Sequence, residues 1–183
     1  MERNLMVAGF GGQGVMTLGK FLADATCNST DMNVTFFPSY GAEQRGGTAN
    51  CYVVIADEEI GAPMGDAMDD LIVMNDASLN KFLYKLLPGG TLYINSSIVT
   101  TEVTREDIKV VKAPVTELAL EMGNSKVLNI IMLGVYIGYT EVIPAEVVWN
   151  TIEHKLVKKP ALLPLNKKAF EMGLELGRKQ KNH

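Results

Sequence analysis

Four glycines within six residues, from Gly9 to Gly14, constrain this chain more than any other stretch. They follow an apolar segment, residues 4–10, which has the composition of a buried strand, and from about Gln13 apolar side chains recur at helical spacing. The pattern is G-x-G-x-x-G between a strand and a helix. It predicts a tight turn at which the backbone closely approaches a neighbouring group.

The remaining pattern predicts an α/β fold. Further strands are expected at 33–39, 48–56, 70–75, 91–95 and 108–114. Helices are expected at 77–87, ending at Pro88, and then at 115–123, 124–140, 144–156 and from Ala161 onward. Strands that alternate with helices favour a Rossmann-like, mostly parallel sheet with helices on both faces, followed here by a helical C-terminal third. The length of 183 residues fits a single domain, 1–183.

Two glycines, Gly134 and Gly138, stand four residues apart in an apolar helix segment. Isolated glycines in a helical pattern usually have a packing reason, so we expect them to pack this helix closely on the sheet.

Composition and charge narrow the class of protein. The net charge of −4 disfavours a nucleic-acid partner. Cys27 and Cys51 are the only cysteines and are far apart in sequence, so the chain alone builds neither a Cys-ligated metal site nor an iron-sulfur site. The strongly apolar segment 127–140 is too short for a membrane span. We therefore expect a soluble cytoplasmic protein with reduced thiols, no membrane segment and no metal site.

The glycine loop has two interpretations. Unpaired N–H groups at the start of a helix attract anions, so the loop could hold a phosphate or carboxylate. Alternatively, the glycines serve only strand-to-helix packing. A dinucleotide would also need an acidic residue after the second strand, whereas the sequence there is "FFPSYG" and Asp31 precedes that strand. A free-standing NAD- or FAD-binding Rossmann oxidoreductase is therefore the alternative hypothesis.

A second loop, "SYGAEQRGG" at residues 39–47, joins the second and third strands. Loops at the carboxyl ends of strands are where open α/β sheets bind ligands, and Tyr40, Glu43 and Arg45 are the polar groups available. Arg suits either a carboxylate or a phosphate. Glu43 and Arg45 could instead pair with each other and only fix the loop.

The two loops together resemble those of a known family. "GFGGQGV", followed by "PSYGAEQRGGTANCYVVIADEEIGAP", is similar to the gamma subunit, or gamma domain, of the 2-oxoacid:ferredoxin (acceptor) oxidoreductases. The resemblance continues in "NIIMLGVYIG" and "LNKKAFEMG", so it extends over nearly the whole chain. The cofactor-binding or interface residues that it carries over are Gly9, Gly11, Gly12, Gln13, Gly14, Tyr40, Gly41, Glu43, Arg45, Gly46 and Gly47.

The resemblance implies a subunit of an assembly that converts a 2-oxoacid and coenzyme A into an acyl-CoA and CO2 and passes electrons to ferredoxin. Its partners would be alpha and beta subunits, with a delta subunit in some members, and ferredoxin would be an indirect partner. Thiamine diphosphate, magnesium and iron-sulfur clusters would be held by those partners. This chain would contribute no catalytic residue, and its loops would touch coenzyme A or only neighbouring subunits.

Three questions stay open at this point. Pyruvate, 2-oxoglutarate and branched-chain 2-oxoacids all fit as substrates, with indolepyruvate less favoured. Both loops could also bury against other subunits in a pure scaffold. An isolated subunit would expose an apolar patch, so self-association of the chain alone is a further alternative.

Overall fold

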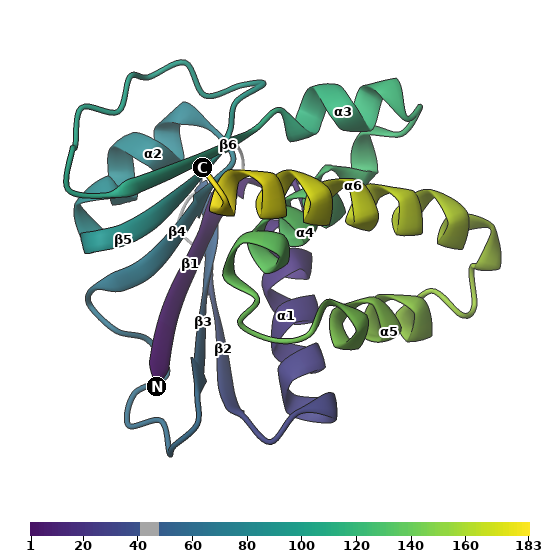
Figure 1. The fold of residues 1–183 in the computed structure, drawn as a ribbon, viewed down its shortest axis with the longest axis horizontal. Helices are drawn as coiled ribbons and strands as arrows, with labels where there is room; N and C mark the ends of the chain where they lie inside the picture. Colours follow the sequence, from purple (N-terminus) through teal and green to yellow (C-terminus); the bar gives the residue numbers. More distant parts are fainter. Residues whose placement is uncertain (41–47) are drawn as a thin grey trace.

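The computed structural model describes residues 1–40 and 48–183, with Tyr40 described in its backbone only. A six-stranded sheet forms the centre of the molecule, in the order β2-β3-β1-β4-β5-β6 (Figure 1). The strands are β1 (Glu2–Phe10), β2 (Asn33–Tyr40), β3 (Thr48–Ala56), β4 (Met68–Val73), β5 (Leu86–Asn95) and β6 (Lys109–Ala113). Strands β1, β4, β5 and β6 are parallel, whereas β3 is antiparallel to both β1 and β2. The predicted α/β class with a mostly parallel sheet is confirmed.

The first half of the sheet differs from a Rossmann arrangement in one respect. Strand β3 lies between β1 and β2, so the second strand does not neighbour the first. The cause is the connection from β2 to β3, residues 41–47, which is too short to hold a crossover helix. Strands joined by a short connection pair in antiparallel fashion, whereas a parallel pair needs a crossover of a dozen or more residues.

Helices cover both faces, as predicted, but unequally. They are α1 (Val15–Ser29), α2 (Asp76–Phe82), α3 (Val115–Glu121), α4 (Leu128–Thr140), α5 (Ala145–Lys155) and α6 (Leu163–Lys181). The larger core lies between one face and helices α1, α4, α5 and α6. On the other face a smaller core is closed by α2 and by apolar side chains of the segment 96–108. The described helices include none that is long and apolar enough to cross a membrane.

The helix predicted at 77–87 is shorter in the structure. Helix α2 ends at Phe82, a 3-10 turn covers Leu83–Lys85, and β5 begins at Leu86 and runs through Pro88. The apolar spacing of this segment is helical, but the pairing of β5 with β4 shifts between Met68 and Asp70. Pro88 can therefore be part of β5, because the residues of β5 beside this irregularity make no regular ladder hydrogen bonds with β4.

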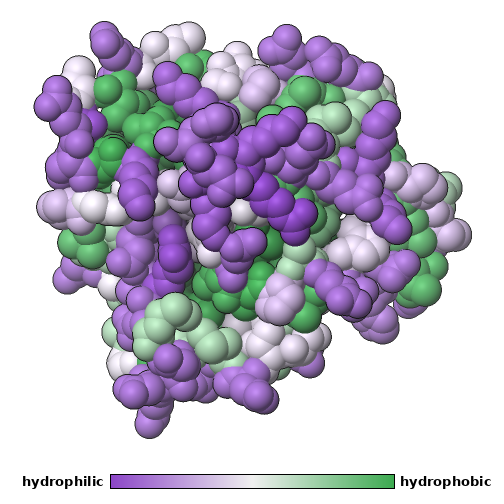
Figure 2. All heavy atoms as spheres, viewed as in Figure 1, coloured by the Kyte–Doolittle hydropathy of each residue, from purple (hydrophilic) through white to green (hydrophobic). Residues whose placement is uncertain are grey.

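Gly134 and Gly138 pack against α6 rather than against the sheet, which corrects the prediction. A Cβ at Gly134 would lie 2.4 Å from the carbonyl oxygen of Phe170, and one at Gly138 would lie 2.3 Å from that of Leu174. The approach is reciprocal, because α6 presents Gly173 and Gly177 to the backbone of α4. The outer side of α6 carries hydrophilic side chains, which Figure 2 shows over its C-terminal half.

Candidate functional site

The glycine loop has the tight geometry that the sequence predicts. Gly9 is buried, and a Cβ there would lie 2.7 Å from Oε1 of Gln13 and 2.9 Å from Cβ of Met74. Gly12 and Gly14 have φ angles of 90° and 71°, in the left-handed region that favours glycine. Helix α1 begins directly after Gly14. These three glycines are therefore explained by the turn itself.

The side chain of Gln13 points inward and fixes the loop. Its Oε1 accepts hydrogen bonds from the backbone N–H of Phe10 at 2.8 Å and from Nδ2 of Asn75 at 3.2 Å. Its Nε2 donates to the carbonyl oxygen of Met74 at 3.1 Å. Gln13 thus ties the end of β1 to the end of β4. We interpret it as a positioning residue for the loop.

The loop lies at the topological switch point of the sheet. The chain leaves β1 through α1 on one face toward β2, and leaves β4 through α2 on the other face toward β5. Open α/β sheets bind ligands outside the carboxyl ends of neighbouring strands whose following connections leave on opposite faces of the sheet. In this chain Gln13 bridges the two strand ends there. A ligand or partner would therefore meet the outer surface of the loop.

That outer surface consists of Phe10, Gly11 and Gly12. All three residues are exposed, and the side chain of Phe10 is a large apolar group in contact with water. A Cβ at Gly11 or Gly12 would meet no atom within 4 Å. Gly11 also has no positive φ, so neither the turn nor packing requires a glycine at this position.

The ends of the second loop lie beside the first. Thr48 pairs with Phe10 across β3 and β1, and Tyr40 pairs with Ala49 across β2 and β3. The two loops therefore leave the same edge of the sheet. Gly41, Glu43, Arg45, Gly46 and Gly47 lie outside the described residues, as does the side chain of Tyr40, so their roles stay predictions.

The structure adds three residues that the sequence analysis missed. Lys81 of α2 donates from Nζ to Oγ1 of Thr48 at 3.4 Å, which places a cation at the same edge. Asn75 caps α2 by accepting from the N–H of Ser78 at 2.8 Å, and an asparagine between a buried strand and a helix is an N-cap signal in the sequence. Asn129 of α4 donates to the carbonyl oxygen of Gly14 at 3.3 Å, and no local sequence pattern indicates this contact.

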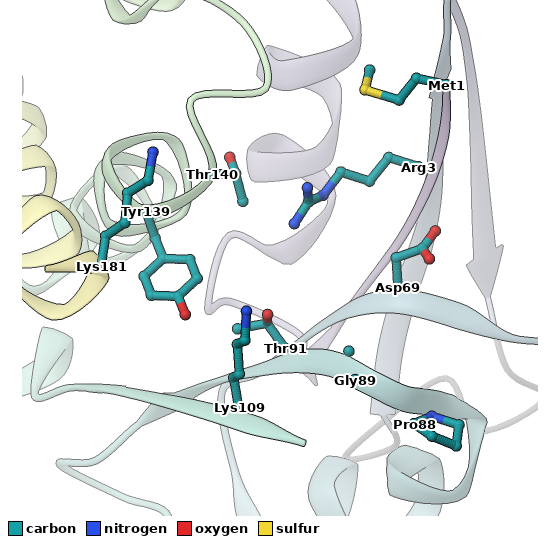
Figure 3. A pocket seen from close by; sticks show the side chains of 11 residues that line it. Met1, Arg3, Asp69, Pro88, Gly89, Thr91, Lys109, Tyr139, Thr140 and Lys181 are labelled. Atoms are coloured by element: carbon teal, nitrogen blue, oxygen red, sulfur yellow. The ribbon is translucent and has the colours of Figure 1, made fainter. Parts of the chain in front are cut away.

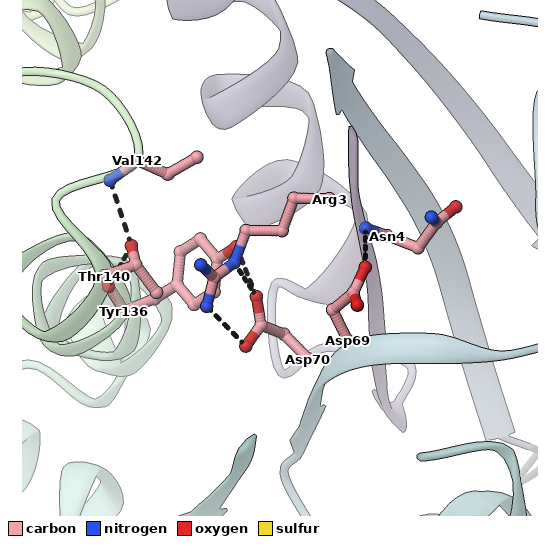
Figure 4. Close-up of polar contacts among 7 residues, drawn as sticks. All are labelled: Arg3, Asn4, Asp69, Asp70, Tyr136, Thr140 and Val142. Atoms are coloured by element: carbon pink, nitrogen blue, oxygen red, sulfur yellow. Dashed lines mark hydrogen bonds and ion pairs between the residues drawn. The ribbon is translucent and has the colours of Figure 1, made fainter. Parts of the chain in front are cut away.

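A buried charge cluster lies toward the opposite edge of the sheet, near the starts of β1 and β4, and Figure 4 shows its contacts. Asp70 of β4 is fully buried and accepts from Nε of Arg3, from Nη2 of Arg3 at 3.0 Å and from the hydroxyl of Tyr136 at 3.0 Å. Burial raises the pKa of the Asp70 carboxyl, and the hydrogen bonds from Arg3 oppose that rise. The cluster joins β1, β4 and α4, so its first role is structural.

Among the described residues, no group of three or more His, Cys, Asp or Glu side chains could hold a metal ion. The dinucleotide hypothesis also loses support. The strand beside β1 at the loop edge is the antiparallel β3, which begins with Thr48. Within the described residues, neither β2 nor β3 therefore offers a carboxylate for a ribose.

These features define an α/β protein with a glycine loop at the switch point of a mixed sheet and, beside it, the strand ends that flank the second glycine-rich segment. The sequence matches the family described as "Pyruvate ferredoxin/flavodoxin oxidoreductase" over residues 4–176. The chain belongs to this family, and the resemblance stated from the two loops is confirmed.

Individual proteins agree with this assignment. The chain is 34% identical over 180 residues to the ketoisovalerate oxidoreductase subunit VorA of Methanothermobacter marburgensis, covering 97% of this chain and 37% of that protein. The gamma subunit of a keto/oxoacid ferredoxin oxidoreductase from Geobacter sulfurreducens superposes with a TM-score of 0.88 at 25% identity, covering 98% of both chains. The 2-oxoglutarate:ferredoxin oxidoreductase of Magnetococcus marinus, solved with 2-oxoglutarate, coenzyme A and succinyl-CoA bound, gives a TM-score of 0.89 at 25% identity, over 97% of this chain and 31% of that one.

Proposed function

We propose that the chain is the gamma subunit of a 2-oxoacid:ferredoxin oxidoreductase. The whole assembly would cleave the bond between the carboxylate and the keto carbon of a 2-oxoacid, releasing CO2. The acyl group would be transferred to the sulfur of coenzyme A, a proton would be released, and an electron pair would pass to ferredoxin. The match over residues 4–176 carries this proposal, and the full-length similarity to a gamma subunit supports it.

In this proposal the chain supplies binding surface, alpha and beta partners hold thiamine diphosphate and magnesium, and a beta or delta partner holds the iron-sulfur clusters. The purified chain alone should therefore not oxidise a 2-oxoacid. Turnover by the isolated chain would contradict the proposal.

The contact surface would be the carboxyl edge of the sheet, where both glycine loops emerge. Phe10, Gly11 and Gly12 are exposed there, and neither the turn nor packing explains the glycine at position 11. Lys81 adds a cation beside Thr48. An exposed apolar ring, a backbone without side chains and a lysine suit close approach by coenzyme A, whose phosphates are anionic. The same features suit a neighbouring subunit, which is the scaffold alternative.

Gly11→Ala separates function from folding. The added methyl group meets no atom within 4 Å in the chain, so the free energy of unfolding should change by less than about 0.5 kcal/mol. If the loop touches coenzyme A, this variant should raise the apparent KM for coenzyme A in the intact assembly without loss of subunits. If the loop touches only a partner, assembly should weaken and the KM should stay unchanged.

Arg45→Ala tests the second loop with the same two measurements. A raised KM for coenzyme A supports a ligand contact, and weakened assembly supports a subunit contact.

Gly61→Ala is the matched control for Gly11→Ala, because Gly61 is also exposed and a Cβ there meets no atom within 4 Å. If neither Gly11→Ala nor Arg45→Ala alters the KM or the assembly, the loop edge is not the contact surface.

A further inference from the structure

A cavity of about 610 Å³ opens at the edge of the sheet where the parallel strands begin (Figure 3). Its walls come from the starts of β1, β5 and β6 and from the C-terminal ends of α4 and α6. Both glycine loops leave the opposite, carboxyl edge, so this cavity is separate from the surface discussed above. Its volume lies in the range of small-molecule sites, which is about 300–1,000 Å³.

Cationic side chains from three elements line this cavity: Arg3 of β1, Lys109 of β6 and Lys181 of α6. Asp69 is the carboxylate among the lining residues, and its Oδ2 accepts the backbone N–H of Asn4 at 2.8 Å. Lys181 is paired with Glu141. Lys109, by contrast, makes no ion pair with any residue within the described ranges. Its ammonium group is therefore available to a ligand.

The guanidinium of Arg3 is held in a fixed orientation. Its Nε and Nη2 both donate to the buried carboxylate of Asp70, which Tyr136 also holds (Figure 4). Arginine has five N–H donors in a planar fork, so the Nη1 donors are not used by this pair. The side chain of Arg3 is 29% exposed and lines the cavity. Asp70 thus orients a cation whose remaining donors can serve a ligand.

The other walls combine hydroxyl groups with apolar surface. Thr91 lies at the floor beside Lys109, and the hydroxyl of Tyr139 points toward both of them in Figure 3. The ring of Tyr139 packs edge-on against Tyr93 at a centroid distance of 5.7 Å, which fixes its position. Pro88 adds an apolar surface. Sites with a few convergent polar groups on such walls are typical of small organic ligands.

We propose that this cavity binds a small organic anion whose phosphate or carboxylate group lies between Arg3 and Lys109. The hydroxyls of Thr91 and Tyr139 donate further hydrogen bonds to the same group. Arg3 lies on β1 and Lys109 on β6, with β4 and β5 between them. A bound anion therefore also links β1 to β6 and stabilises the folded chain.

Thermal unfolding of the full-length chain tests this inference. The probes are sodium phosphate and sodium succinate, each compared with sodium chloride at equal ionic strength. We expect at least one probe to raise the Tm saturably. Lys109→Met should weaken the apparent affinity of the chain for that probe anion about tenfold, as expected for loss of one charge-assisted contact. Lys112→Met is the matched control, because Lys112 is also exposed on β6 but lines a different cavity.

The outcomes separate the sources of the anion. A response to phosphate alone assigns a phosphate-bearing ligand, and a response to succinate alone assigns a carboxylate. No saturable response to either probe would overturn the inference, and so would equal losses in Lys109→Met and Lys112→Met. None of these results depends on partner subunits or on coenzyme A, so they are independent of the function proposed above.

Discussion

Gly173 of α6 lies directly against Gly134 of α4, with 2.9 Å between the Cα of Gly134 and the place where a Cβ of Gly173 would stand. That Cβ would also lie 2.1 Å from the carbonyl oxygen of Ile131. The neighbouring atoms belong to backbone, which cannot rotate away as a side chain can. The contact between these helices therefore depends on the absence of side chains at both positions.

Gly173→Ala should accordingly destabilise the chain. Overpacking of this kind costs about 1–3 kcal/mol, occasionally more, because the two helices must move apart. The measurement is urea unfolding, with Gly61→Ala as the control at an open position. A change below about 0.5 kcal/mol in Gly173→Ala would show that the helices are not in backbone contact.

Asp70→Asn should be among the most destabilising single substitutions in the chain. Removing one partner of a buried ion pair typically costs about 3–5 kcal/mol, since the other charge stays behind. Here Arg3 is 29% exposed and can be partly hydrated, so we expect the lower part of that range. Tyr136→Phe removes only a hydroxyl donor and should cost less. Chemical denaturation of both variants checks this order, and an Asp70→Asn variant as stable as the unmodified chain would refute it.

Acid should release the segment that follows β5. The hydrogen bonds that Thr101 and Thr100 donate lower the pKa of Asp76 to about 2. The pKa of Asp76 in the folded chain lies below the ordinary pKa of an aspartate. The stabilisation by these hydrogen bonds is therefore complete when the pH is above that ordinary pKa, and it is lost as the pH falls through about 2. Amide hydrogen exchange at Thr100 and Thr101 is the measurement.

Asp76→Asn serves as the comparison for that experiment. The variant should show reduced protection at these amides already at pH 5, with little further change on acidification. Equal protection in the variant and the unmodified chain across the whole range would mean that Asp76 does not anchor the segment.

The two cysteines should react differently with thiol reagents. Cys27 is exposed, whereas Cys51 is buried beneath α1, and burial raises the pKa of its thiol to about 12. One thiol should therefore titrate with Ellman's reagent in the native chain and two in denaturant. Rapid modification of both native thiols would contradict the packing of α1 on β3.

Much of this fold could be predicted from local pattern. The strand, glycine turn and helix at Gly9–Gly14 are found as expected, because left-handed backbone at Gly12 and Gly14 leaves a strong signal in sequence. The place of β3 between β1 and β2 could not be read in this way. Strand order depends on pairing between distant segments, and apolar periodicity reports only whether a residue is buried.

The candidate site likewise combines features that local sequence pattern predicts with contacts between residues far apart in the sequence, which it does not predict. Gln13 belongs to the predicted loop, yet its inward orientation depends on Met74 and Asn75, which are more than 60 residues away. Arg3 and Asp70 are 67 residues apart, and neither stands in a recognisable motif. Gly173 lies in the helix predicted from Ala161 onward, but its close contact could not be predicted, since that contact depends on the facing backbone of α4.

The most direct test is co-purification of a tagged copy of the chain from the cells that produce it, followed by identification of the bound proteins. The eluate is then assayed for reduction of a viologen dye that requires both a 2-oxoacid and coenzyme A. We predict that alpha and beta subunits carrying thiamine diphosphate are retained and that the eluate is active, with the substrate profile naming the 2-oxoacid. A chain that elutes alone, without this activity, would contradict its assignment as a gamma subunit.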